Sequence, residues 1–275
     1  MIELIGALFS YSFILRALLV GMLVALCSAL LGVSLVLKRY SMIGDGLSHV
    51  GFGALSVAMA MNLAPLQVSI PVVVAAAFLL LRISENSKIK GDAAIALISS
   101  SSIAIGVIVT SLTSGMNADV YNFLFGSILA MSRGDVFLSI ILSIIVLLLF
   151  ILSYHKIFAV TFDENFAKAT GTKVGIYNMM IALLTAVTIV VGMRIMGALL
   201  ISSLIIFPAL SSMRVFRSFR GVIIFSAFLS MVCFFWGIAA SYAFDTPAGA
   251  SIVIVNLLAF GICGVIGLIP RGEKE

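Results

Sequence analysis

Apolar runs of about twenty residues recur along the whole chain, and this length is enough to cross the hydrocarbon core of a bilayer. The run LLVGMLVALCSALLGVSLVL at 18–37, for example, contains no charged residue. Of the 275 residues, 63% are hydrophobic and 10% are charged, whereas a soluble domain has roughly 45–50% and about 25%. The runs are continuous rather than alternating, which favours helices over membrane strands. The sequence therefore predicts an all-α, polytopic membrane protein.

We expect eight or nine membrane-spanning helices in a single membrane domain covering residues 1–275. The candidate spans are 17–37, 46–62, 66–83, 92–113, 135–153, 175–193, 196–213, 221–242 and 249–268. With nine spans and the N-terminus outside, 13 of the 16 Lys and Arg residues fall in internal segments. The positive-inside rule therefore predicts an external N-terminus and a cytoplasmic C-terminus. Residues 119–132 are apolar but too short to span, and we expect an interfacial or re-entrant helix there.

The net charge and the cysteine residues do not indicate a further function. The net charge of +5 is explained by the internal basic residues and indicates no nucleic-acid partner. Cys27, Cys233 and Cys263 lie far apart inside apolar runs, so they read as small core residues rather than a disulfide framework or a thiolate metal cluster.

The stretch YSMIGDGLSHVGFGAL at 40–55 places Asp45 and His49 four residues apart, on one face of the second expected helix. Ionisable groups inside a bilayer are costly and usually face a cavity or a partner. A carboxylate oxygen and an imidazole nitrogen one turn apart can bind one divalent cation, most naturally zinc, with manganese or iron as alternatives. Two other roles stay open: Asp45 as a helix cap and His49 as a packing residue.

Asp245 lies in SYAFDTPAGAS, just before Pro247 at the external start of the last expected span. One role is to complement the charge of that helix end, with Thr246 as the cap. The other role is that of a metal ligand or an entrance residue. Since Asp45 lies toward the inside and Asp245 toward the outside, we expect them at opposite ends of a pathway rather than around one ion.

The longest internal connection, YHKIFAVTFDENFAKATGTKV at 154–174, predicts a helix of about two turns. Asp163 is the expected N-cap, Glu164 complements the positive helix end, and Gly171 is a natural stop. Phe162 and Phe166 share one face. So short a helix is unstable alone in water and must dock on something. It docks either on its own protein and the lipid headgroups or on a cytoplasmic motor subunit.

Four stretches in this order resemble the permease subunits of the ABC-3 family, bacterial importers of zinc, manganese or iron. They are SMIGDGLSHVGFGAL (41–55), FDENFAKATGTKV (162–174), MGALLISSLIIFPALSS (196–212) and DTPAGASIVIV (245–255). The Gly-Asp-x-x-Ser-His pattern of the first is the most specific. Gly46 and Val50 are mild departures, since the family typically has Ala after that Asp and a small residue after the His.

The resemblance implies a homodimer in a bacterial cell membrane, with a central pathway at the two-fold axis. It also implies two cytoplasmic ABC ATPase subunits and an extracytoplasmic metal-binding protein. Asp45 and His49 become pathway ligands, and 162–172 becomes the coupling helix, with Ala167 and Gly171 at the spacing of the family's Glu-Ala-Ala…Gly loop. The metal is cargo, and no permanent cofactor is expected. Since the chain contains no G-x-x-x-x-G-K-[ST] phosphate loop, we expect a transport subunit, not an enzyme, with ATP hydrolysis in a separate partner.

Two other function classes compete with this hypothesis. A proton- or ion-coupled secondary transporter would use Asp45 and His49 as a relay, but neither inverted repeats nor broken helix pairs are evident. An intramembrane metalloprotease would need a motif such as H-E-x-x-H, and the two histidines, His49 and His155, do not form one.

Overall fold

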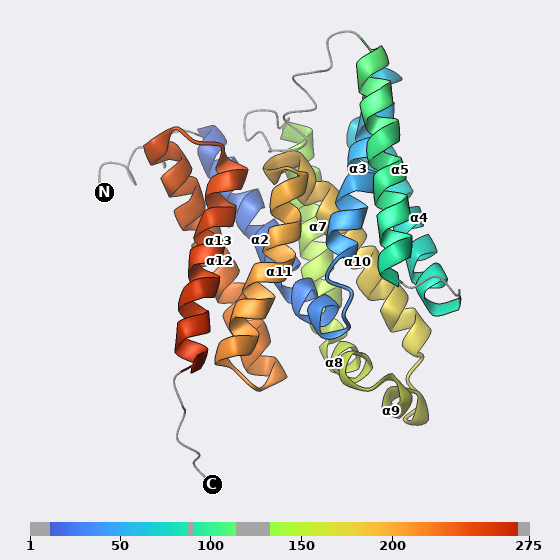
Figure 1. Ribbon diagram of the computed structural model, residues 1–275, viewed down its shortest axis with the longest axis vertical. Coiled ribbons are helices and arrows are strands. Elements are labelled where there is room, and N and C mark those ends of the chain that lie inside the picture. Colours follow the sequence, from blue (N-terminus) through green and yellow to red (C-terminus); the bar gives the residue numbers. More distant parts are fainter. Residues whose placement is uncertain (1–11, 87–90, 114–132, 269–275) are drawn as a thin grey trace.

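The computed structural model describes residues 12–86, 91–113 and 133–268, and within these ranges every regular element is an α-helix. The long helices run alongside one another as a bundle (Figure 1). The described helices, with the short α8 and α9 included, are α2 (Ser12–Leu37), α3 (Ile43–Ala60), α4 (Pro65–Asn86), α5 (Gly91–Leu112), α7 (Arg133–Leu152), α8 (Tyr154–Phe162), α9 (Glu164–Ala169), α10 (Val174–Met196), α11 (Ala198–Val215), α12 (Phe219–Phe244) and α13 (Ala248–Leu268). The predicted all-α fold is confirmed.

Each expected span corresponds to one helix of the structure. Of the described helices, 7 are long and apolar enough to cross a membrane. The other two spans are α3 and α11, each of 18 residues. Such a helix is about 27 Å long, close to the thickness of the hydrocarbon core. Asp45 and His49 lower the hydropathy of α3. The expected helix at 119–132 lies outside the described residues.

Helix α2 is the central element of the bundle. In its most apolar window 72% of the residues are buried, against 17% in α13. It packs against α10, α11 and α12, and the large core cluster includes α2 residues such as Val24 and Leu31. The helix is apolar on all sides because it is surrounded by other helices.

A close approach of two backbones fixes α2 against α11. A Cβ atom built on Gly32 would lie 2.0 Å from the carbonyl oxygen of Ile205. Only glycine fits there, because the obstructing atom belongs to the backbone and cannot rotate away. This contact sets the position of α11 at the centre of the bundle.

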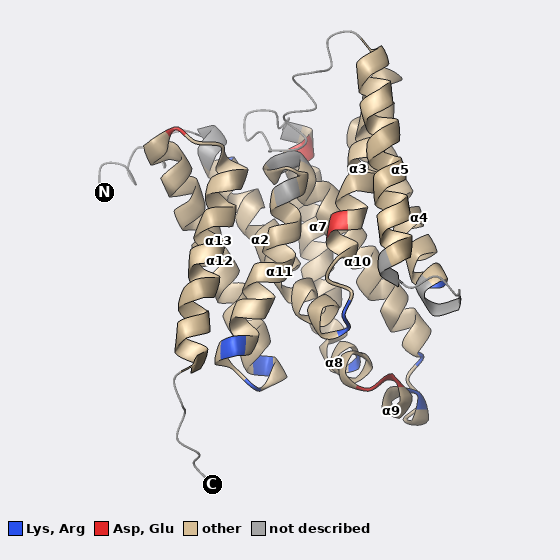
Figure 2. Ribbon diagram, in the orientation of Figure 1, with Lys and Arg blue, Asp and Glu red and all other residues tan. Residues whose placement is uncertain are grey.

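The charged residues are distributed unevenly between the two ends of the bundle. Figure 2 shows Lys and Arg gathered at the end formed by α8, α9 and the turn between α11 and α12. Arg214, Arg217 and Arg220 lie in or beside that turn. Asp245 follows α12, which starts at this basic end, so it lies at the opposite end. This asymmetry agrees with the basic segments identified in the sequence.

Replacing Gly32 by alanine should destabilise the bundle, because the new methyl group forces α2 and α11 apart. Overpacking of this kind typically costs about 1–3 kcal/mol. We expect a clearly lower melting temperature of the purified protein in detergent. The matched control is Gly175→Ala in α10, where a Cβ meets nothing within 4 Å. Equal melting temperatures of the two variants would contradict the close backbone contact.

Candidate functional site

The Asp45–His49 pair lies in the first turns of α3, a helix that packs against α4, α5, α10 and α11. Figure 1 shows α3 beginning above the lower end of α2, so this end of α3 is recessed from the basic end. The N-cap residue is Met42, and no side chain caps the helix. Asp45 therefore does not cap α3, and its carboxylate is available for other contacts.

The two side chains face one another across a short gap. Asp45 Oδ2 lies 3.5 Å from His49 Nε2, and the side chains are 39% and 18% exposed. The other carboxylate oxygen, Oδ1, accepts a hydrogen bond of 3.4 Å from Ser202 Oγ of α11. The second ring nitrogen, His49 Nδ1, is buried and has no hydrogen-bond partner in the described part of the chain. The site thus joins α3 to α11.

The separation of the pair fits two ligands of one metal ion. With bonds of about 2.0–2.2 Å, two ligands of a tetrahedral zinc ion are about 3.4 Å apart. The distance between Asp45 Oδ2 and His49 Nε2 is 3.5 Å. In residues 12–86, 91–113 and 133–268, no three His, Cys, Asp or Glu side chains come together to hold a metal. One chain therefore offers two acidic or imidazole ligands here, and this small number suits transient rather than permanent binding.

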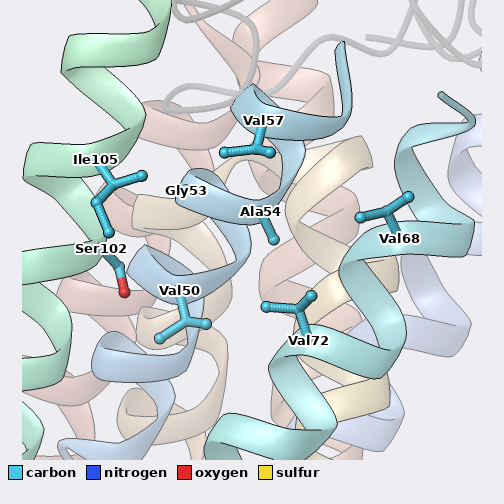
Figure 3. A pocket seen from close by; sticks show the side chains of 8 residues that line it. All are labelled: Val50, Gly53, Ala54, Val57, Val68, Val72, Ser102 and Ile105. Carbon is cyan, nitrogen blue, oxygen red and sulfur yellow. The ribbon is translucent and has the colours of Figure 1, made fainter. Parts of the chain in front are cut away.

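An apolar cavity of about 220 Å³ lies between α3, α4 and α5, and its lining begins on α3 at Val50, the residue after His49 (Figure 3). It is lined by Val50, Gly53, Ala54, Val57, Val68, Val72, Ser102 and Ile105. Among these eight residues, only Ser102 has a side-chain oxygen (Figure 3). Such a wall cannot replace the water shell of a cation. The cavity is therefore not a second metal site.

Asp245 lies apart from this pair. It is the exposed C-cap of α12, with a left-handed backbone (φ 50°), in the turn leading to α13. It does not join Asp45 and His49 in any three-residue cluster of the described chain. Its role as a metal ligand or an entrance residue stays a prediction.

The connection between α7 and α10 folds as the short helices α8 and α9. Asp163 caps α9, since its carboxylate accepts hydrogen bonds of 2.9 Å from the backbone N–H groups of Asn165 and Phe166. Gly171 follows in the left-handed conformation (φ 78°) that ends the helix. The predicted cap and stop are confirmed, although α9 has 6 residues rather than two full turns.

One face of α9 is buried and another is free. Ala167 is fully buried and packs with Val160 of α8 and Val174 of α10. Phe166 lies on the free face of α9 and is 63% exposed. Phe162 is instead the last residue of α8, and Asp163 between the two helices is extended, so the prediction that Phe162 and Phe166 share one face of a single helix is wrong. The Phe162 side chain is 58% exposed. The Phe162 ring contacts Phe219, with 5.6 Å between the ring centroids. The helix is therefore anchored on its own protein and still presents an aromatic surface.

A polar network holds the start of α9. Lys38 Nζ donates a hydrogen bond of 2.7 Å to Glu164 Oε1 and a second one to Asn178 Oδ1 of α10. Asn178 Nδ2 also donates to Glu164 Oε1, at 3.1 Å. Burial would raise the pKa of Glu164, but these hydrogen bonds and the Lys38 charge outweigh it, so the pKa lies below its ordinary value.

The family assignment follows from a match over nearly the whole chain. The sequence model described as the ABC 3 transport family matches residues 10–266. The chain belongs to this family. The resemblance seen in the four sequence stretches is therefore confirmed.

Relatives and a solved structure of similar length support the assignment to the ABC 3 family. The manganese import system permease protein ScaB of Streptococcus gordonii is 29% identical over 94% of this chain and 92% of its own length. The high-affinity zinc uptake system membrane protein ZnuB of Haemophilus influenzae is 28% identical over 91% and 96%. A chain of PsaBC from Streptococcus pneumoniae, solved in complex with a Fab, superposes with a TM-score of 0.86 at 29% identity, covering 96% of this chain and 95% of its own.

Sequence reasoning missed three residues of these sites in the ABC 3 chain. Ser202 reaches Asp45 from 157 positions away, and Lys38 reaches Glu164 from 126 positions away. Asn178 joins Lys38 across 140 positions. Ser202 and Asn178 are polar residues inside apolar runs, and this position could have indicated that they take part in polar contacts. Which residues they contact depends on helix packing alone.

Substituting Asp163 by alanine in the ABC 3 chain should loosen α9 by removing both cap hydrogen bonds. Loss of an N-cap typically costs about 0.5–2 kcal/mol, and a helix of 6 residues has little else to hold it. We expect faster trypsin cleavage after Lys168 in the otherwise folded protein. The control is Asp163→Asn, which keeps an accepting oxygen and should cleave at nearly the native rate. Identical cleavage of all three forms would show that the cap does not hold α9.

Proposed function

We propose that this chain is the membrane-spanning permease subunit of an ATP-driven importer of divalent metal ions. The observation that carries the proposal is the Asp45–His49 pair, two partly buried metal-type ligands 3.5 Å apart on a helix of an apolar bundle. Membership of the ABC 3 transport family supports ATP-driven transport and gives no support to the ion-coupled secondary transporter. The pair would replace part of the water shell of the passing ion and release it again.

Zinc is the first candidate for the transported metal and manganese is the second. An imidazole nitrogen beside a carboxylate oxygen suits zinc, and ZnuB is named as a zinc uptake protein. ScaB, of similar identity, is named as a manganese import protein. Iron fits the same mixed donors. Asp245, exposed at the opposite end of the bundle from the basic turns, would meet the ion at the entrance.

The partners follow from the same proposal. Two copies of the chain would enclose a central pathway, and an extracytoplasmic metal-binding protein would deliver the ion. The basic end, with α8 and α9, would face the cytoplasm in accordance with the positive-inside rule, so that the N-terminus is outside and the C-terminus inside. The segment 162–172 would be the coupling helix, inserting the exposed ring of Phe166 into a separate ATPase subunit.

Metal uptake should depend on His49. In the source cell lacking this chain, the intact form should restore the cellular content of zinc or manganese. His49→Ala should restore at least tenfold less at equal protein level, since even residues that only support a metal ligand contribute about 10–100-fold. His155→Ala on α8 is the matched control and should behave as the intact form. Unchanged zinc, manganese and iron in the deletion strain under metal starvation would overturn the proposed function.

Binding of the ATPase should depend on the aromatic surface of α9. Phe166→Ala removes a ring that is 63% exposed, and truncating such an aromatic anchor commonly costs about 2 kcal/mol or more of binding. We expect the amount of copurified ATPase to fall clearly while the protein remains inserted. The control is Phe244→Ala, 77% exposed at the other end of α12. Equal copurification of both variants would remove the coupling role of α9.

A further inference from the structure

The ammonium group of Lys38 is buried between three helices. Its side chain is 7% exposed and follows directly after α2, whereas Glu164 belongs to α9 and Asn178 to α10. The ammonium donates to both partners, and Asn178 in turn donates to Glu164. The three side chains therefore close a ring of hydrogen bonds. Removing the carboxylate partner of a buried lysine strongly destabilises a fold. The ion pair with Glu164 therefore holds Lys38 against the start of α9.

A tight turn connects Lys38 to the metal site. The N–H of Tyr40 donates to the carbonyl of Leu35 (2.8 Å) and that of Arg39 donates to Val36 (3.1 Å), with Arg39 in the left-handed region (φ 61°). This pattern is a Schellman motif, which locks the end of α2. The N–H of Ile43 then donates to Tyr40 (3.0 Å), at the first residue of α3. The backbone is thus held by hydrogen bonds up to Ile43, two residues before Asp45.

The same turn is packed against α10. A cavity of only about 20 Å³ remains beside it, lined by Leu35, Lys38, Tyr40, Ile43, Leu81, Asn178, Ile181 and Ala182. This space is comparable to one water molecule. Because so little free space borders the turn, we expect a displacement of Lys38 to move the beginning of α3. Asp45, in the first turn of α3, would move with it.

We propose that Lys38 is a positioning residue that transmits movement of α9 to the Asp45–His49 pair. Lys38 does not touch the transported ion. It ties the segment that would meet the ATPase to the short turn that leads into α3, the helix of Asp45 and His49. The inference rests on the proposed function, since α9 moves only if an ATPase engages it. It adds a physical connection between the two sites through residues 38–42.

The test measures metal ions transported per ATP hydrolysed. The chain is reconstituted in vesicles with its ATPase and binding-protein partners, using zinc(II), manganese(II) and iron(II) in turn as probes. Lys38→Met should assemble and hydrolyse ATP but transport about five- to tenfold fewer ions per ATP, at the lower end of typical coupling between distant sites. The double variant Lys38→Glu with Glu164→Lys restores the ion pair in reverse and should recover most of the lost coupling. Lys173→Met, an exposed lysine at the N-cap of α10, should leave the ratio unchanged.

Three outcomes separate the inference from the proposed function. A native ratio in Lys38→Met would overturn the positioning role of Lys38. If Lys38→Met fails to assemble, Glu164→Gln decides instead, because it keeps the shape of the partner and removes only the charge. A native ratio in Glu164→Gln would then overturn the inference as well. A native complex that transports none of zinc(II), manganese(II) and iron(II) would overturn the proposed function itself.

Discussion

A charged side chain inside an apolar helix bundle needs a partner, and this requirement organises both sites of the protein. The Asp45 carboxylate faces His49 at 3.5 Å and accepts from Ser202 at 3.4 Å. The Lys38 ammonium, 7% exposed, is held by Glu164 at 2.7 Å. Unpaired, each of these groups would strongly destabilise the bundle. The ionisable groups at the Asp45–His49 pair and at the start of α9 are therefore stable only where another side chain supplies a partner.

The partners are supplied by close packing of the central helices. Gly32 allows the backbone of α2 to touch that of α11 at Ile205, three residues after Ser202. Helix α2 ends at Leu37, directly before Lys38, and α3 begins at Ile43. The central helix thus leads at its end into the turn between the two polar sites. Apolar packing sets the relative positions of the helices, and the polar side chains form their hydrogen bonds within that arrangement.

The short helix α9 combines local and tertiary stabilisation. Its cap at Asp163 and its stop at Gly171 are local, while Ala167 and Glu164 anchor it to α8, α10 and the end of α2. Phe166 remains exposed on this anchored helix. A rigidly held aromatic surface at the basic end of a membrane bundle is suited to docking a soluble partner.

Apolar run length, N-cap chemistry and i, i+4 spacing are local properties of a chain. For this reason the helices, the cap at Asp163 and the Asp45–His49 pair could be predicted from the sequence. In contrast, the folding of the whole bundle decided that Met42 rather than Asp45 occupies the N-cap of α3 and that Ser202 contacts Asp45. It also decided that Lys38 is buried against Glu164, 126 positions away. Which distant residues meet depends on helix packing, and that packing is fixed by backbone approaches such as Gly32 to Ile205.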